Sequence, residues 1–422
     1  MKFLVDRVRG MQDILPPDGE LWERVEGLMR RTAGLCGFSY MRTPILEHTE
    51  LIDRSAGDSS DIVQKEMYTF NDKSGRSVTL RPEFTAGVLR SVVTGLLGKT
   101  SFPLKIMYFG PCYRYEKPQA GRLREFFQFG LEIFGSTSYL ADIEAIFVAH
   151  KIFTDLGISG VRLEINAVGC SKCRESYLNA VKHFFESQAD LLCETCRTRI
   201  IKNPLRVFDC KDEKCQSLFG DAPNTTDFIC EDCQRYFEKL KKCLESLNIY
   251  YLVNTRIVRG LDYYTKFVFE FITNVDGHDL TICGGGRYDD LSASLGGKDL
   301  PATGLAIGVE RIIKLLNNNM TLAKKTNTVY VACVNYEAEK LCLNIISDLR
   351  ELNVKTDFDI VGRELKSQMK YADKMGYNYV IIIGMDELNS EMVSVKNMFD
   401  GSEVKIEIKD FSEKFLLFMN RK

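Results

Sequence analysis

The segment 259–291 constrains the fold and chemistry of this chain more than any other stretch of similar length. It begins with Arg-Gly-Leu-Asp-Tyr-Tyr at 259–264, continues with Phe-Val-Phe-Glu-Phe at 267–271 and reaches Gly-Gly-Gly-Arg-Tyr-Asp at 284–289. Aromatic residues beside an apolar run are typical of strand packing, and a triple glycine is typical of a loop. Glycines also let a ligand or another backbone approach closely. Because Arg259 and Arg287 suit carboxylate or phosphate, the segment predicts a strand beside a pocket for a small polar molecule and an anion.

Composition limits the classes of protein that need be considered. The chain has 422 residues and a net charge of −2, so two or three domains are expected and any nucleic-acid binding must rely on local patches. Residues 1–7 lack the apolar region of a signal peptide, and the apolar run 379–383 is too short to cross a bilayer. We therefore expect a cytoplasmic protein without a membrane partner, whose fourteen cysteines are free or bind metal.

Hydrophobic periodicity predicts two domains. Residues 1–325 contain a helix at 20–35 and strands at 104–109 and 126–134, which favours an α+β catalytic domain on an antiparallel sheet. A cysteine-rich, helical insertion is expected at about 170–250. Residues 326–422 alternate between strands and helices, with helices at 337–352 and 363–376, and this alternation predicts a small α/β domain.

Several polar side chains are candidates for binding a small molecule. Glu83 and Thr85 are two residues apart, and together they can bind an ammonium group; the alternative is a capped helix start at Thr85. Gln128 and Glu132 have an even spacing and share one face of the predicted strand. The charged loop 113–125 before that strand is either a solvated hairpin or a ligand-binding loop.

These motifs resemble those of a known enzyme family. The segments 259–264 and 284–289 are similar to the two histidine-specific motifs of the histidyl-tRNA synthetases. Residues 108–132 resemble motif 2 of class II aminoacyl-tRNA synthetases, residues 304–313 resemble motif 3, and the region 6–44 resembles motif 1, which builds the family's dimer interface. The C-terminal domain resembles the family's anticodon-binding domain, so the resemblance spans nearly the whole chain.

The resemblance implies a histidine–tRNA ligase that forms histidyl-adenylate from L-histidine and ATP with Mg²⁺, and then transfers histidine to the 3′ end of tRNA(His). It also implies a homodimer. In this family Arg114 and Arg259 would hold the α-phosphate and Arg311 the nucleotide, while the loop tip with Gln119 and Arg122 would reach the tRNA acceptor end. The implied histidine-binding residues are Glu83, Thr85, Gln128, Glu132, Tyr263 and Tyr264.

A row of cations in the C-terminal domain is a candidate tRNA contact. Arg363, Lys366, Lys370 and Lys374 are spaced by three, four and four residues, which places them on one face of the predicted helix. A solvated helix face is the alternative.

The cysteines of the insertion suggest structural zinc. Cys170, Cys173, Cys193 and Cys196 form two C-x2-C pairs separated by 19 residues, a spacing typical of structural zinc sites. A looser second set consists of Cys210, Cys215, Cys230 and Cys233. The pairs can also interleave, and a set of reduced, partly buried thiols without metal is the alternative.

Two other functions are compatible with parts of the sequence. One is a non-catalytic, regulatory paralogue that partners ATP phosphoribosyltransferase, and the other is a zinc-dependent RNA-binding module. Arg114, Arg259 and Glu83, together with a complete C-terminal domain, argue against the first, and the full set of ATP-site residues argues against the second.

Overall fold

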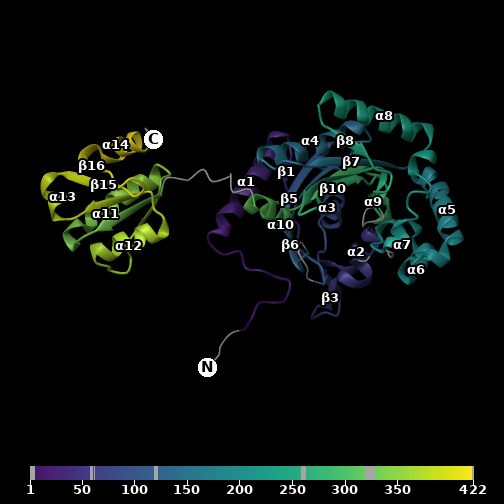
Figure 1. The fold of residues 1–422 in the computed structure, drawn as a ribbon, viewed down its shortest axis with the longest axis horizontal. Helices are drawn as coiled ribbons and strands as arrows, with labels where there is room; N and C mark the ends of the chain where they lie inside the picture. The colour runs from purple at the N-terminus through teal and green to yellow at the C-terminus, as the bar shows by residue number, and fades with distance from the viewer. Residues whose placement is uncertain are drawn as a thin grey trace. The chain divides into compact units, whose positions relative to one another are not determined.

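The chain forms two compact units, Met1–Leu322 and Ala323–Lys422 (Figure 1). A computed structural model describes residues 5–57, 60, 62–117, 122–257, 263–318 and 328–420. The predicted domain boundary at 325/326 lies outside these ranges. The described strands of each unit pair only within that unit, and each unit has its own hydrophobic core.

An eight-stranded, mainly antiparallel sheet organises the N-terminal unit. Its strands in spatial order are β1 (Ser39–Tyr40), β5 (Leu104–Tyr113), β6 (Glu125–Phe134), β11 (Ala302–Gly308), β10 (His278–Arg287), β9 (Thr265–Val275), β7 (Arg162–Gly169) and β8 (Tyr251–Val253). Only the outer pairs β1–β5 and β7–β8 are parallel among these strands. A second sheet has the order β2 (Leu46–His48), β4 (Ser77–Leu80) and β3 (Tyr68–Asn71). The predicted antiparallel α+β fold is confirmed.

The triple glycine lies inside the large sheet. Gly284, Gly285 and Gly286 belong to β10 and pair with β9 on one side and β11 on the other. The loop interpretation of these glycines is therefore wrong. Residues 265–275 and 278–287 of the segment that the sequence singled out are thus two central strands of the large sheet.

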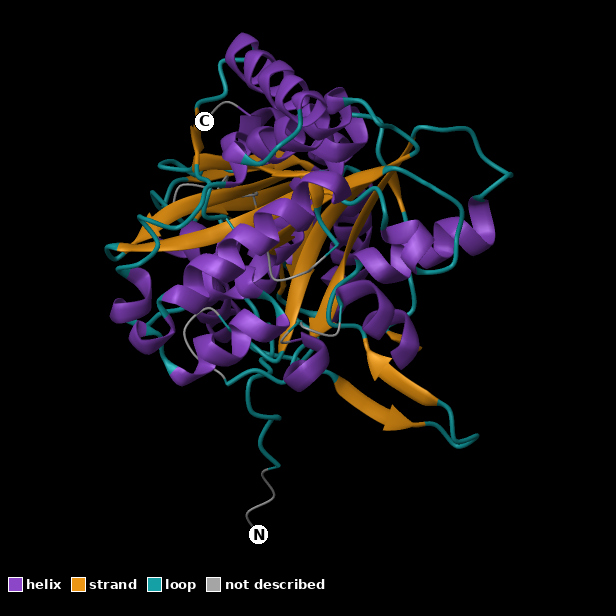
Figure 2. Ribbon diagram, turned by 90° about the vertical axis from the view of Figure 1, so that its right-hand side faces the viewer, coloured by secondary structure: helices purple, strands orange, loops and turns teal. Residues whose placement is uncertain are grey.

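Helices cover the large sheet and bury its core (Figure 2). Trp22, Val25, Met29 and Ala33 are buried along the first helix at helical spacing. The helices of this unit outside the insertion are α1 (Asp18–Leu35), α2 (Thr49–Ala56), η1 (Ile62–Glu66), α3 (Thr85–Ser91), η2 (Val92–Leu96), α4 (Tyr139–Asp155), α9 (Leu291–Ser294) and α10 (Val309–Asn318). In the part of the chain that the structure describes, no helix combines the length and apolar character needed to span a bilayer.

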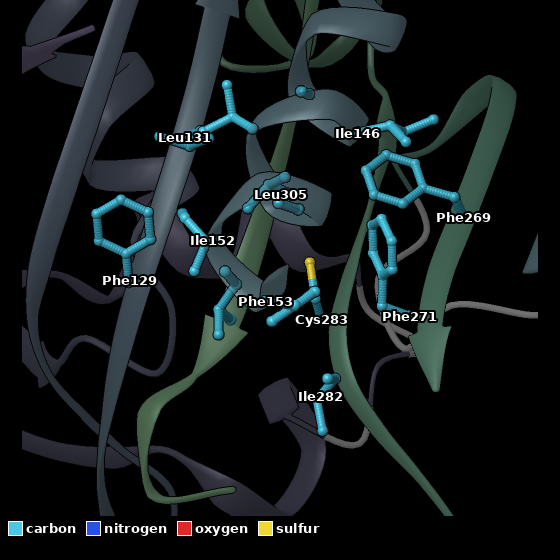
Figure 3. Close-up of a cluster of buried hydrophobic side chains, with 14 of the residues drawn as sticks. Phe129, Leu131, Ile146, Ile152, Phe153, Phe269, Phe271, Ile282, Cys283 and Leu305 are labelled. Carbon is cyan, nitrogen blue, oxygen red and sulfur yellow. The ribbon is translucent and has the colours of Figure 1, made fainter. Parts of the chain in front are cut away.

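The core lies between α4 and the central strands (Figure 3). Phe269 and Phe271 are two residues apart on β9, so both side chains point to the same face, where Phe271 meets Phe153 of α4. Leu131 of β6 and Leu305 of β11 are buried in the same cluster. Burial of each such side chain stabilises the fold by about 1.5–3 kcal/mol, which fixes the strands that carry the polar residues described below.

A helical insertion separates β7 from β8. It consists of α5 (Ser171–Ser187), η3 (Ala189–Leu191), α6 (Glu194–Lys202), η4 (Pro204–Asp209), α7 (Glu213–Gln216), η5 (Thr225–Asp227) and α8 (Glu231–Ser246). The insertion has a small core of its own around Val181, Phe185 and Val207. In Figure 1 its labelled helices α5, α6 and α7 lie together at one edge of the unit.

The C-terminal unit is a five-stranded α/β sheet. Its strands in order are β13 (Lys355–Phe358), β12 (Thr328–Cys333), β14 (Tyr379–Ile383), β15 (Met392–Asn397) and β16 (Glu403–Glu407), and the first three are parallel. Val329 and Val331 share a core with α11 and α14, whereas Tyr330 and Ala332 pack with the face that carries α12. The helices are η6 (Tyr336–Ala338), α11 (Glu339–Glu351), α12 (Leu365–Met375), α13 (Met385–Ser390), η7 (Ile408–Asp410) and α14 (Phe411–Asn420). The predicted small α/β domain is confirmed.

Candidate active site

A buried carboxyl group lies at the centre of the candidate site. Glu132 on β6 is 1% exposed and accepts hydrogen bonds from the hydroxyls of Thr85 (2.9 Å) and Tyr108 (3.1 Å). The hydroxyl of Tyr288 donates to the second carboxyl oxygen. Three elements and the strand itself thus converge on one side chain, which is the arrangement that a buried polar group requires.

Burial determines the protonation of this carboxyl group. Loss of hydration raises the pKa of Glu132 to about 8, and the nearby charge of Glu83 acts in the same direction. The hydroxyl donors favour the charged form and oppose the shift. Near neutral pH Glu132 therefore holds an exchangeable proton in a site lined by hydroxyl groups.

Gly304 makes room for Glu132. The two residues are directly opposite each other on β11 and β6. A Cβ atom at position 304 would lie 1.7 Å from Glu132 Oε2 and 2.4 Å from the Leu131 carbonyl oxygen. Only glycine leaves the carboxyl group in its observed position.

Glu83 and Thr85 lie beside Glu132 at the start of α3. The carboxylate of Glu83 accepts from the backbone N–H groups of Thr85 (2.6 Å) and Ala86 (2.8 Å). It therefore satisfies free donors at the helix start, so the predicted capped helix start is real but the cap is Glu83 rather than Thr85. Burial raises the pKa of Glu83, whereas these hydrogen bonds and the charge of Arg114 oppose that shift.

The two tyrosines before β9 line the same region. The ring of Tyr263 lies 4.8 Å from that of Tyr264 and 5.4 Å from that of Tyr288, measured between ring centroids. A Cβ at Gly286 would lie 2.9 Å from Cδ1 of Tyr264, so the glycine of β10 lets this ring approach the strand. Tyr263 and Tyr264 thus line the site, and they also pack partly in an apolar cluster.

Two predicted nucleotide-binding arginines, Arg114 and Arg311, come after β5 and β11, and the predicted histidine-binding residue Gln128 lies on β6, the strand between these two. Arg114 follows β5, donates to the Pro82 carbonyl oxygen (3.0 Å) and lies over the Phe126 ring. Gln128 on β6 accepts from the Cys112 thiol (3.4 Å) and pairs with Gly308, three residues before Arg311. Arg311, at the start of α10, donates to the Thr281 carbonyl oxygen.

Arg287 is a structural residue. Its side chain is fully buried and forms ion pairs with Asp142 (3.2 Å) and Asp289 (3.0 Å). It also donates to the carbonyl oxygens of Ser136 and Ser138. Arg287 was expected to bind a carboxylate, and the carboxylates that it binds are those of the protein itself. This arginine therefore ties β10 to α4 and does not face a ligand.

Other predicted site residues lie outside this cluster or outside the described residues. Arg259 and Gln119 lie outside the described residues. Arg122 forms an ion pair with Glu116 (3.2 Å). In the C-terminal unit, Lys366 and Lys370 are exposed on α12. The helix was predicted to begin at 363, which is wrong: Arg363 precedes α12 and pairs with Asp359 (2.5 Å), which removes it from the helix face.

The cysteines of the insertion form two groups that differ from the predicted pairing. Cys170 and Cys173 lie with Cys230 and Cys233, and Cys193 and Cys196 lie with Cys210 and Cys215. The set Cys170, Cys173, Cys193 and Cys196 is therefore wrong as a single site. The pairs interleave because α5 leads away from β7 and α8 returns to it, which brings the first and last pairs together.

Two residues of the site had no role assigned from the sequence. Tyr108 and Tyr288 donate their hydroxyls to Glu132. Both tyrosines lie within motifs that the sequence singled out, but neither was assigned a role there. An isolated tyrosine in an apolar strand gives no signal of its hydrogen-bond partner, since that partner comes from another strand.

The antiparallel sheet, with a buried polar site at its centre and arginines at its strand ends, is the catalytic fold of the class II aminoacyl-tRNA synthetases. Residues 10–174 and 227–312 match the family model "Histidyl-tRNA synthetase", and residues 328–416 match "Anticodon binding domain". The chain belongs to the histidyl-tRNA synthetase family. Residues 175–226, the greater part of the insertion, lie between the two matched ranges.

Individual relatives agree with this family over nearly their whole length. "Histidine--tRNA ligase" of Caldanaerobacter subterraneus subsp. tengcongensis is 45% identical over 97% of this chain and 99% of the relative. The protein of the same name from Caldicellulosiruptor bescii is 44% identical over 96% and 97%. The crystal structure of apo S. aureus histidyl-tRNA synthetase is 33% identical, has a TM-score of 0.82 and covers 98% of this chain and all of that one.

Proposed function

We propose that the chain activates L-histidine with ATP to histidyl-adenylate and transfers the histidyl group to the 3′ end of tRNA(His). The observation that carries this proposal is the buried carboxyl group of Glu132, surrounded by three hydroxyls within the catalytic sheet. A neutral imidazole offers one donor and one acceptor. A site with a carboxyl group and a tyrosine hydroxyl can pair both nitrogens.

Two groups of residues recognise histidine, one at its imidazole ring and one at its α-ammonium group. Glu132 accepts from the imidazole N–H, and Tyr264 orients the ring beside Tyr263. Glu83, Thr85 and Gln128 hold the α-ammonium group, which the carboxyl group of Glu83 favours. An apolar amino acid of similar size leaves the buried polar groups unpaired, so the site rejects it strongly.

Activation requires charge stabilisation more than covalent chemistry. The histidine carboxylate attacks the α-phosphorus of ATP, a mixed-anhydride (acyl–phosphate) bond forms, and the bond from the α-phosphorus to the bridging oxygen breaks as pyrophosphate leaves in line. Arg114 and Arg259 hold the α-phosphate as negative charge develops there, and Arg311 holds the nucleotide. Mg²⁺ bound with ATP would screen the remaining phosphates. Fixed positions of the two reactants supply much of the acceleration.

The tRNA, the second subunit and the compartment belong to the same proposal. Gln119 and Arg122 contact the acceptor end, whereas Arg363, Lys366 and Lys370 contact the tRNA backbone through the C-terminal unit. The enzyme acts as a cytoplasmic homodimer through the region 6–44. We also propose that cysteines of the insertion hold structural zinc.

One pair of assays distinguishes this function from its rivals. Histidine-dependent exchange of pyrophosphate into ATP tests activation, and charging of tRNA(His) tests transfer. A regulatory partner of ATP phosphoribosyltransferase and a zinc-dependent RNA-binding module would both lack exchange. Absence of exchange in the folded, metal-replete protein would contradict the proposal.

A further inference from the structure

The first of the two cysteine groups, named the inner thiolate group, closes the base of the insertion. Cys170 directly follows β7 and precedes α5, and Cys173 lies in the first turn of α5. Cys230 and Cys233 occupy the equivalent positions at the start of α8, where the chain returns. The group therefore joins the segment that leaves the catalytic sheet to the segment that comes back.

The second group, named the outer thiolate group, lies entirely within the insertion. Cys193 and Cys196 are at the start of α6, Cys210 directly follows η4, and Cys215 lies within α7. Cys196, Cys210 and Cys215 are buried in the small core of the insertion. This group connects parts of the insertion to one another and not to the sheet.

The geometry of both groups suits one metal ion each. All four sulfur atoms of each group lie within 4.8 Å of one another. The distances are 3.5 Å for Cys170–Cys173, 4.0 Å for Cys173–Cys233 and 3.8 Å for Cys193–Cys210. Four thiolates at about 2.3 Å around a tetrahedral zinc ion lie about 3.8 Å apart. Disulfide sulfurs would be only about 2.0 Å apart.

Backbone groups also point at the sulfurs. The N–H of Cys230 donates to Cys173 Sγ (3.0 Å), and the N–H of Cys193 donates to Cys215 Sγ (3.3 Å). Such donors orient thiolate ligands and stabilise their charge, as the surroundings of metal ligands generally do. Each group therefore has both the ligands and the supporting hydrogen bonds of a closed structural site.

The residue that follows the inner thiolate group on α5 contacts the candidate active site. Arg174 follows Cys173, and its Nη1 donates to the backbone carbonyl oxygen of Tyr264 (3.0 Å). Next to this contact, Gly169 at the end of β7 pairs with Lys266 at the start of β9. The position of α5 is thus transmitted to the backbone that carries Tyr263 and Tyr264.

We propose that the chain binds two zinc ions, one in each thiolate group, and that the inner ion positions the histidine-binding tyrosines through Arg174, whereas the outer ion only holds the insertion together. The second part rests on the proposed function, because it assigns Tyr264 to the histidine site. Arg174 is a positioning residue that acts through the Tyr264 backbone.

The metal content is tested first, independently of activity. Elemental analysis of the full chain purified without chelator is expected to give two zinc ions per chain. Cys230→Ser and Cys193→Ser are each expected to lose one ion, whereas Cys36→Ser, a cysteine outside both groups, keeps two. One zinc or none in the unaltered chain, or iron in place of zinc, would overturn the assignment.

The coupling to the active site is tested with the metal retained. Arg174→Ala is expected to keep two zinc ions and to raise the KM for histidine by about tenfold in pyrophosphate exchange, because a hydrogen bond from a charged donor is lost. The KM for ATP should not change, and Arg174→Lys should restore most of the loss. An unchanged KM for histidine in Arg174→Ala overturns the coupling, whereas absence of exchange in the unaltered chain contradicts the proposed function instead.

The two thiolate groups provide the matched comparison. Cys230→Ser is expected to raise the KM for histidine as Arg174→Ala does, and Cys193→Ser is expected to leave it near that of the unaltered chain. Equal effects of both cysteine variants on this KM would overturn the separate roles of the two ions.

Discussion

The hydroxyl of Tyr288 on the segment after β10 donates a hydrogen bond to the buried carboxyl group of Glu132 on β6, a residue 156 positions earlier in the chain. β11 lies between β6 and β10 in the sheet. The contact is possible because Gly304 of β11 has no side chain that would occupy the space. Three strands thus cooperate to present one polar group.

Replacement of Tyr288 by phenylalanine removes one of the three hydroxyl donors. We expect the KM for histidine to rise and the free energy of unfolding to fall by about 1–3 kcal/mol, because a buried acceptor loses its partner. Histidine-dependent exchange and urea unfolding measure the two effects. Tyr251→Phe removes a matched bond to Glu245 (2.9 Å) on the surface and should change neither quantity appreciably. Equal behaviour of the two variants would contradict the role of Tyr288.

Gly304→Ala tests the space beside Glu132. The added methyl group would meet Glu132 Oε2 at 1.7 Å, so we expect loss of histidine activation and a destabilisation of about 1–3 kcal/mol. Gly27→Ala in α1 is the control, because a Cβ there has no neighbour within 4 Å and alanine favours a helix. Retained activity in Gly304→Ala would show that the site adapts and that the glycine is not required.

The raised pKa of Glu132 predicts a specific pH dependence of stability. The folded state binds this proton more tightly than the unfolded state, whose group has the ordinary value of 4.5. The contribution of this bound proton to the free energy of unfolding is therefore complete below about pH 4.5 and is lost as the pH rises to about 8. Urea unfolding of the unaltered chain and of Glu132→Gln at several pH values should show a stability difference that falls with pH in this window. A constant difference would refute the shift.

Arg259→Ala tests the proposed contact with the α-phosphate. We expect it to abolish adenylate formation and leave the fold intact, because the charge that develops on the α-phosphate loses a fixed partner. Pyrophosphate exchange measures the first effect and circular dichroism the second. Arg122→Ala, which loses only an exposed ion pair with Glu116, should retain exchange. Near-normal exchange in Arg259→Ala would rule out the assignment.

Charge reversal of Lys366 and Lys370 tests the proposed tRNA contact of the C-terminal unit. The double change to glutamate should raise the KM for tRNA and weaken its salt dependence, because phosphate contacts release counterions. Exchange of pyrophosphate, which needs no tRNA, should not change. The same reversal at the exposed residues Lys211 and Lys214 of the insertion is the control. An unchanged KM for tRNA would remove the contact.

The order of the elements and most of their bounds were predictable from local patterns. The helix predicted at 20–35 is α1 (Asp18–Leu35), and the strand predicted at 126–134 is β6 (Glu125–Phe134). These elements follow from apolar periodicity, which depends on neighbouring residues only. The helix predicted from 363 begins at Leu365 instead, because Asp359 holds Arg363 before the helix.

The sequence by itself determined the family, the antiparallel α+β fold, the small α/β unit and the residue types of the site, because periodicity and short motifs are local. The tertiary structure alone decided which partners these residues find. It placed Tyr108, Thr85 and Tyr288 on Glu132, buried Arg287 between two carboxylates, and interleaved the cysteine pairs. The physical reason is that strand order and helix return bring distant residues together, and no local pattern encodes the distance between them.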